Sequence, residues 1–244
     1  MQQVPLKIKV VEAHNYYFKE PYKLGNENWK IRYFTDLLSN NIPFDAKILD
    51  LGCGALDSLL FLNWLGYTNT FGTDKSGLDP SSYKISIDEL NNKVHFLKND
   101  FDSYPLPYPN SFFDVIYSFD CIEYLKNPLQ VLDESNRVLR NGGLFFITTA
   151  NAVNLHKRII TLLGKNPQGL LEHFLNENCQ NLIIREYTMH EMKQLMELVE
   201  LTPKQTRYYK QCSNYQKKLL RIYNLVEAMY PKLSARFGIT AIKK

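Results

Sequence analysis

Residues 47–58, KILDLGCGALDS, constrain the fold of this chain more than any other stretch. An apolar run of strand type comes first, Gly52 and Gly54 then form a tight turn, and the apolar residues 59–62 begin a helix. A strand, a glycine turn and a helix in this order open a doubly wound, nucleotide-binding α/β fold. The two glycines allow the backbone to approach a ligand where a side chain would intrude.

Asp50 indicates which kind of ligand this turn receives. A dinucleotide places its diphosphate at a helix N-terminus, and a carboxylate in the turn would repel that diphosphate. S-adenosylmethionine (SAM) carries an ammonium and a sulfonium but no phosphate, so an acid suits it. With Cys53 between the glycines, the stretch resembles motif I of the seven-strand SAM-dependent methyltransferases, L-D-L-G-C-G-x-G. The third glycine of the motif is Leu56 here, and we expect its bulky side chain at the helix start to affect cofactor affinity and pose.

The composition is that of a globular protein. The 244 residues are 45% hydrophobic and 22% charged, which suits one domain with an ample core. A net charge of +4 is too small to indicate a nucleic-acid partner by itself. The cysteines are scattered without a C-x-x-C pair, which argues against a zinc ribbon or a disulfide framework and fits a reducing compartment. No stretch approaches the roughly 20 apolar residues of a bilayer span, and a signal-peptide pattern is absent, so we expect a cytoplasmic location.

Asp74 ends the second expected strand, residues 69–74. It follows Gly54 by about 20 residues, the distance at which such folds place an acid against the ribose hydroxyls. One helix and one strand account for this spacing, because together they return the chain to the same edge of the sheet. We assign Asp74 and the adjacent Lys75 to the cofactor site.

A third strand is expected at 94–97, and Asp100 and Phe101 follow it. The resemblance to SAM-dependent methyltransferases implies that an acid at this place accepts a hydrogen bond from the adenine amino group. It also implies that the next residue packs against the adenine ring. Asp100 and Phe101 are therefore predicted cofactor contacts.

Residues 104–151 extend the resemblance. A segment L-P-Y-P precedes an expected strand at 113–119, an E-Y-L turn follows this strand, and R-V-L-R-N-G-G leads into a further apolar strand. This pattern is similar to the type-11 methyltransferases and implies a cofactor contact at Phe119. The resemblance covers residues 46–151. It implies a Rossmann-like three-layer sandwich whose seven-stranded, mostly parallel sheet has the order 3-2-1-4-5-7-6, with the last strand antiparallel.

We expect a single methyltransferase domain over residues 1–244. Its parts are an N-terminal helical cap (1–45), the SAM-binding core (46–151), an insertion that shapes the acceptor site (152–187), and a C-terminal helix with a strand pair (188–244). Within the cap, residues 4–11 are expected as a short strand or an extended arm, and 29–38 as a helix by their apolar spacing. The sequence T-M-H-E at 188–191 predicts a capping box at a helix start.

Transfer of a methyl group to an oxygen of high pKa requires a base within hydrogen-bond reach, and two residues are candidates. His156 follows the fifth expected strand, on the acceptor side. Glu123 follows the fourth strand, at the sheet edge where such folds bind ligands. No cluster of metal ligands stands out. We therefore expect a SAM-dependent methyltransferase that acts, at oxygen, on a small-molecule, glycan or lipid-linked acceptor and releases S-adenosyl-L-homocysteine (SAH).

Three alternatives stay open. The chain would be a catalytically silent scaffold or binding protein if Leu56 closed the cofactor pocket. Basic residues at 217–221 would fit an RNA methyltransferase, although nucleic-acid base methylation is disfavoured because the fourth strand ends in S-F-D-C and not in D/N-P-P-Y/F. An NAD-dependent dehydrogenase would fit the glycines, but Asp50 argues against it.

Overall fold

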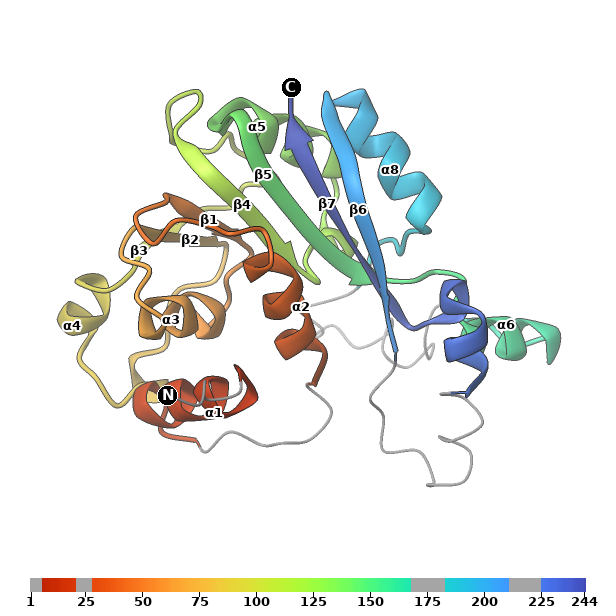
Figure 1. Ribbon diagram of the computed structural model, residues 1–244, viewed down its shortest axis with the longest axis horizontal. Coiled ribbons are helices and arrows are strands. Elements are labelled where there is room, and N and C mark those ends of the chain that lie inside the picture. The colour runs from red at the N-terminus through yellow and green to blue at the C-terminus, as the bar shows by residue number, and fades with distance from the viewer. Residues whose placement is uncertain (1–5, 21–27, 168–182, 211–224) are drawn as a thin grey trace.

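The fold is built on one mixed β-sheet (Figure 1). The computed structural model describes residues 6–20, 28–167, 183–210 and 225–244. The strands are β1 (Ile48–Leu51), β2 (Thr70–Asp74), β3 (His95–Lys98), β4 (Phe113–Phe119), β5 (Leu139–Ala150), β6 (Leu201–Tyr209) and β7 (Arg236–Lys243). They lie in the order β3-β2-β1-β4-β5-β7-β6. β1 to β5 pair in parallel, whereas β7 is antiparallel to β5 and β6, so the predicted strand order is confirmed.

Helices connect most of these strands. They are α1 (Leu6–Tyr17), α2 (Asn28–Leu38), α3 (Asp57–Trp64), α4 (Ile87–Asn91), α5 (Pro128–Val138), α6 (Leu155–Leu162) and α8 (Met189–Leu198), with short 3₁₀ turns η1 (Pro80–Ser82), η2 (Ile122–Tyr124) and η3 (Pro231–Leu233). The helix predicted at 29–38 is α2. The predicted capping box begins α8, where Thr188 and Glu191 each bind a backbone N–H of the other. None of the helices in the described part of the chain has the length and hydropathy of a membrane span.

The N-terminal prediction is wrong for the residues that the structure describes. Residues 4–11 were expected as a strand or arm, but α1 begins at Leu6. Val10, Ala13 and Tyr17 are buried and lie on one face of this helix, which packs against α3. The burial of this helical stripe outweighs the strand preference of the β-branched residues at its start.

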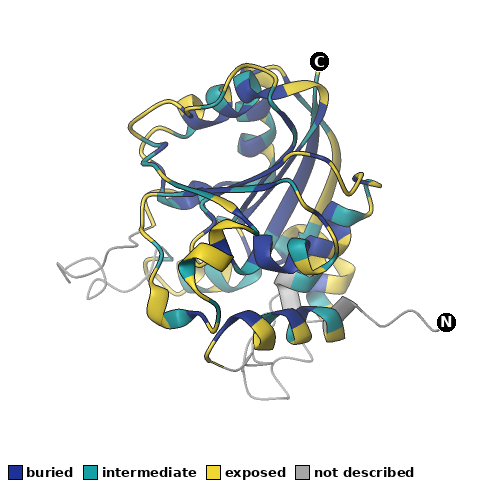
Figure 2. Cartoon of the chain, turned by 90° about the vertical axis from the view of Figure 1, so that its left-hand side faces the viewer, coloured by how far each residue is buried: buried dark blue, intermediate teal, exposed yellow. Residues whose placement is uncertain are grey.

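The sheet separates two hydrophobic cores. Successive strand residues point to opposite faces, so Ile48 enters one core and Leu49 the other. Residues of α1, α2 and α3 belong to the first core, and residues of α5 and α8 belong to the second. Figure 2 shows the buried residues concentrated on the strands between the two helical layers. This arrangement is the expected three-layer sandwich.

The sheet topology places the candidate site. From β1 the chain builds the sheet outward through β2 and β3, and then returns to add β4 on the other side of β1. β1, β2 and β4 end at the same edge, because all three run in parallel. Ligands of doubly wound folds bind at this edge, where the strand order reverses.

Candidate functional site

The turn after β1 is bonded to the end of β2. The Gly52 N–H donates to the Thr73 carbonyl at 2.9 Å, and the Gly54 N–H donates to Asp74 Oδ2, also at 2.9 Å. Gly52 has a φ of +81°, and a Cβ on it would lie 2.4 Å from Cys121 Sγ. Only glycine fits there. A Cβ on Gly54 would meet nothing within 4 Å, so the second glycine faces open space.

Asp74 is held in one orientation at the end of β2. While Oδ2 accepts from Gly54, Oδ1 accepts from the Ser76 N–H at 2.8 Å. Backbone N–H groups thus fix the carboxylate, and its remaining lone pairs are available to a ligand hydroxyl. Lys75, the residue after Asp74, lines the cleft beside this turn.

Asp100 and Phe101 face the turn from the end of β3. Asp100 Oδ2 accepts from Ser103 Oγ at 2.9 Å. The buried Phe101 ring comes within 4.0 Å of the position that a Cβ on Gly52 would take. The two predicted adenine contacts therefore lie beside the glycine turn.

Asp102, which the sequence reasoning missed, ties this loop to the start of α5. Its carboxylate accepts from the backbone N–H of Lys126 at 2.8 Å and of Asn127 at 2.7 Å. Its carbonyl accepts from Asn127 Nδ2 at 3.1 Å. Asp102 thereby joins two walls of one cleft. The local sequence N-D-F-D gives no sign that the second acid has this role.

These elements enclose a cleft of about 380 Å³. Glycines of the β1 turn and Phe101 line it, and so do six charged side chains, Asp74, Asp100, Asp102, Asp120, Lys75 and Lys126. Four carboxylates against two ammonium groups make the lining acidic. An acidic lining attracts a cation and repels a diphosphate. The four carboxylates and the open glycine turn therefore fit SAM, which carries positive charge on its methionine part.

Three predicted cofactor residues do not line this cleft. Asp50 is buried in β1, with its carboxylate beside the Tyr117 hydroxyl. The Cys53 side chain is also buried, and its sulfur lies against Gly72 of β2. The Phe119 ring packs in the first core, with its centroid 5.3 Å from that of Tyr33. The side chains of Asp50 and Cys53 are therefore packed inside the protein next to the turn, and that of Phe119 is packed in the first core.

Asp120 lines the cleft instead, directly after β4, and is a second residue that the sequence reasoning missed. It adopts a left-handed φ of +51°. Its Oδ1 accepts from Arg236 Nη1 at 2.7 Å, from the Tyr33 hydroxyl at 3.3 Å and from Thr148 Oγ1 at 3.4 Å. Burial raises the pKa of Asp120, and the Arg236 guanidinium opposes this rise. The sequence signal that could have identified Asp120 is an acid directly after the fourth strand.

The two predicted catalytic residues lie outside the lining of the cleft. Glu123 is 2% exposed in η2, and its Oε2 accepts from Thr149 Oγ1 at 2.7 Å. Burial, and then the charge of Asp120, raise the pKa of Glu123 to about 7. His156 is half-buried in the first turn of α6. The structure thus brings Glu123 close behind Asp120 but does not bring His156 to the cleft.

Leu56 does not obstruct the cleft, as the alternative of a silent scaffold would require. Its side chain is 0% exposed and belongs to the first hydrophobic core. The residue precedes α3 with φ 62° and ψ 11°, a left-handed conformation that glycine adopts without strain. Leu56 therefore keeps a backbone conformation that suits glycine, and its side chain points into the first core.

Comparisons with known proteins agree with this geometry. A family model described as a methyltransferase domain matches residues 27–205. The mitochondrial ubiquinone biosynthesis O-methyltransferase of Dictyostelium discoideum is 23% identical over an alignment of 181 residues that covers 62% of this chain and 56% of that protein. The chain spans about half the length of the curated relatives that it matches.

Solved structures show the same fold. A SAM-dependent methyltransferase from Archaeoglobus fulgidus aligns with a TM-score of 0.57 at 15% identity, over 87% of this chain and 94% of that one. The [4+2]-cyclase SpnF aligns with a TM-score of 0.61 at 15% identity, over 98% of this chain and 92% of that one. Because the family model covers well over half of the sequence and the sheet has the order expected for the family, the chain belongs to the class I SAM-dependent methyltransferases.

Proposed function

We propose that this protein transfers a methyl group from SAM to an oxygen of a small-molecule acceptor. One observation carries the proposal: residues predicted as cofactor contacts from three separate strand ends converge on one acidic cleft. A fold alone does not assign a reaction, and the same fold occurs in a [4+2]-cyclase. The proposal therefore rests on the chemistry of the cleft together with the family.

The cleft residues divide the cofactor among them. We assign the ribose hydroxyls to Asp74, because backbone N–H groups already orient its carboxylate toward the glycine turn. We assign the adenine amino group to Asp100 and the adenine ring to Phe101. The turn at Gly52 and Gly54 leaves room for the methionine part, whose ammonium suits the acidic lining.

Asp120 is suited to receive the acceptor's proton. Bound SAM supplies a methyl group that is activated by its sulfonium. An acceptor hydroxyl that takes this methyl group would release SAH as the leaving group, and its proton would pass to the Asp120 carboxylate. Oδ1 is already engaged by Arg236 at 2.7 Å, whereas Oδ2 accepts a long hydrogen bond, 3.5 Å, from the Tyr33 hydroxyl. Burial makes the carboxylate a stronger base than one in water.

Neither His156 nor Glu123 is the base in this proposal. Neither lines the cleft, so a direct role for either requires the acceptor to reach beyond it. The charge of Asp120 raises the pKa of Glu123, so the two acids are coupled. The next residue after His156, Lys157, forms an ion pair with Glu186, and burial lowers the Lys157 pKa to about 8.

An oxygen acceptor is supported by the relatives. Three of the curated relatives are named as O-methyltransferases, two of ubiquinone biosynthesis and one of malonyl-[acyl-carrier protein]. We propose a hydroxyl or carboxyl oxygen on a small molecule, with glycan and lipid-linked acceptors in the same class. The alternative of an RNA acceptor rested on residues 217–221, which lie outside the described residues.

Calorimetry with SAM and SAH tests the cofactor part of this proposal. We expect micromolar binding to the wild-type protein and a loss of about tenfold or more in Asp74→Ala, because the ribose loses a charge-assisted hydrogen bond. Asp88→Ala is the matched control, since Asp88 is an exposed acid on α4 outside the cleft. An absence of binding at millimolar SAM would refute the proposal and favour a silent scaffold.

The same protein, with labelled SAM and a panel of hydroxylated acceptors, tests the transfer step. Asp120→Asn should retain SAH binding within about threefold and lower kcat by about 100-fold, the usual range for the loss of a general base. Equal kcat in the variant and the wild type would exclude Asp120 as the base.

A further inference from the structure

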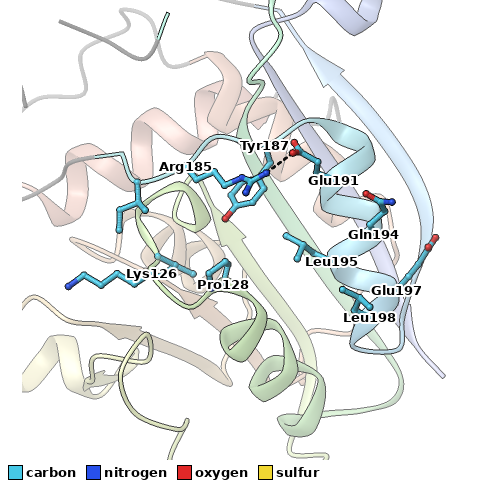
Figure 3. Close-up of a pocket in the computed structure, with 11 residues that line it drawn as sticks. Lys126, Pro128, Arg185, Tyr187, Glu191, Gln194, Leu195, Glu197 and Leu198 are labelled. Carbon is cyan, nitrogen blue, oxygen red and sulfur yellow. Dashed lines mark hydrogen bonds and ion pairs between the residues drawn. The ribbon is translucent and has the colours of Figure 1, made fainter. Parts of the chain in front are cut away.

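A second and larger hollow lies beside the cleft, between the start of α5 and one flank of α8 (Figure 3). Its volume is about 870 Å³. None of the residues proposed to bind the cofactor or to receive the proton lines it. The segment that runs from Ile184 into α8 forms its upper end. We name this hollow the α5–α8 groove.

The flank of α8 that lines the groove carries two leucines. Met192 and Met196 are fully buried and face the second core. Leu195 and Leu198, together with Glu191, lie at helical spacing on a different flank and line the groove. Leu195 also packs against the second core, whereas Leu198 remains 71% exposed. Packing of the helix on the sheet therefore does not account for Leu198.

The opposite wall is apolar as well. Pro128 lies across the groove from the α8 leucines (Figure 3), and Leu125 and Ile184, the latter 48% exposed, also line the groove. Apolar side chains thus face each other across an open hollow. Such a concave apolar surface is a typical ligand site, and large exposed apolar side chains that cluster commonly mark a contact surface.

The charged groups at the upper end of the groove satisfy one another. Arg185 Nη2 donates to Glu191 Oε1 at 2.6 Å, and the guanidinium lies 5.5 Å from the centre of the Tyr187 ring. Figure 3 shows this ion pair above the leucines of α8. The pair needs no polar partner from a ligand. Along α8 the apolar recognition comes from the two leucines, beside which Gln194 and Glu197 also line the groove.

The groove is continuous with the cofactor cleft. Leu125 and Lys126 line both hollows. Lys126 is exposed, and its backbone N–H donates to Asp102, which lines the cleft. This hydrogen bond fixes the backbone at the junction of the two hollows. A ligand that lies along the apolar walls can therefore place a polar head beside Lys126, at the entrance to the cleft.

We propose that the α5–α8 groove binds the hydrocarbon chain of an amphipathic acceptor, whose polar head group enters the cleft to receive the methyl group. This inference rests on the proposed function, which it narrows from small molecules to molecules with an acyl or other alkyl chain. Chain binding would be favourable because it removes apolar area of both partners from water.

The test measures binding of octanoate, decanoate and dodecanoate below their critical micelle concentrations, by calorimetry on the full chain saturated with SAH. We expect affinity to rise about two- to fourfold with each added methylene, because each one buries further apolar surface. Leu198→Asp should weaken dodecanoate binding by about tenfold or more. Since Leu198 is mostly exposed, this variant should fold normally.

Leu162→Asp is the matched control, because Leu162 is 85% exposed on α6 and does not line the groove. It should leave the dodecanoate affinity within about twofold of wild type. Equal affinities along the chain-length series, or equal effects of the two aspartate variants, would overturn the proposal. SAH binding in the same samples separates the two hypotheses: its absence refutes the proposed function, whereas SAH binding without alkyl binding refutes only the groove assignment.

Discussion

At the scale of single residues, Leu56 reveals how a departure from a glycine motif is tolerated. A left-handed leucine costs roughly 1–2 kcal/mol of backbone strain, but truncation of a buried leucine costs about 2–5 kcal/mol. Burial is the larger effect. Leu56→Gly should therefore lower the free energy of unfolding by about 1–4 kcal/mol, measured by urea denaturation, although it restores the motif and relieves the strain.

The same variant tests whether Leu56 influences the cofactor. Since the side chain lies in the first core and outside the cleft, SAH affinity measured by calorimetry should change by less than about threefold. A gain of about tenfold in affinity would mean that the leucine does narrow the cofactor site.

At the scale of elements, the start of α5 is capped from another part of the chain. The N-cap Asn127 makes no side-chain cap bond, and the Asp102 carboxylate receives the N–H groups of Lys126 and Asn127 instead. Asp102→Ala should lower the free energy of unfolding by about 1–3 kcal/mol and weaken SAH binding, because the cleft wall at Lys126 loses its support. Urea denaturation and calorimetry measure the two effects.

Asp133→Ala is the control for this element, because Asp133 is an exposed acid on α5 itself. Its effect on stability should stay within about 0.5 kcal/mol. If the two alanine variants behaved alike, the cap across the cleft would contribute nothing measurable.

At the scale of the whole molecule, buried acids make stability depend on pH. The folded state holds the pKa of Glu123 at about 7 through burial, above the value of about 4.3 in an unfolded chain. Between these values the folded state binds the proton that the unfolded state has lost, so stability falls as pH rises. Glu123→Gln mimics the protonated acid and can still accept from Thr149. Relative to wild type, it should gain about 1–3 kcal/mol between about pH 5 and about pH 8, measured by urea denaturation at both.

This comparison is made as a difference between two proteins at each pH. The contributions of titrating groups that lie far from Glu123 then largely cancel, and the change with pH reports on Glu123 and on its coupling to Asp120. A stability difference that is the same at both pH values would show that Glu123 titrates normally in the folded protein.

The order of elements was largely readable from the sequence. Glycine turns, strand runs and helical stripes are local patterns, and the spacing from Gly54 to Asp74 follows from one helix and one strand. The contact between these two residues, at 2.9 Å, lies where that spacing put it. The N-terminal segment was misread because its β-branched residues favour a strand locally, whereas the burial of Val10 and Ala13 against α3 is a tertiary property.

The sequence by itself determined the glycine turn and the acids at the ends of β2 and β3, because each depends on residues that are close together in the chain. The sheet order was predicted from the resemblance to the methyltransferase family. Only the tertiary structure decided that Leu56 turns into the core and that Asp120 faces the cleft. Arg236 joins Asp120 from the last strand, and its contribution depends on strands β5 and β7 pairing beside β4. Contacts of this kind arise when distant segments are packed together to bury apolar surface, and no local pattern encodes them.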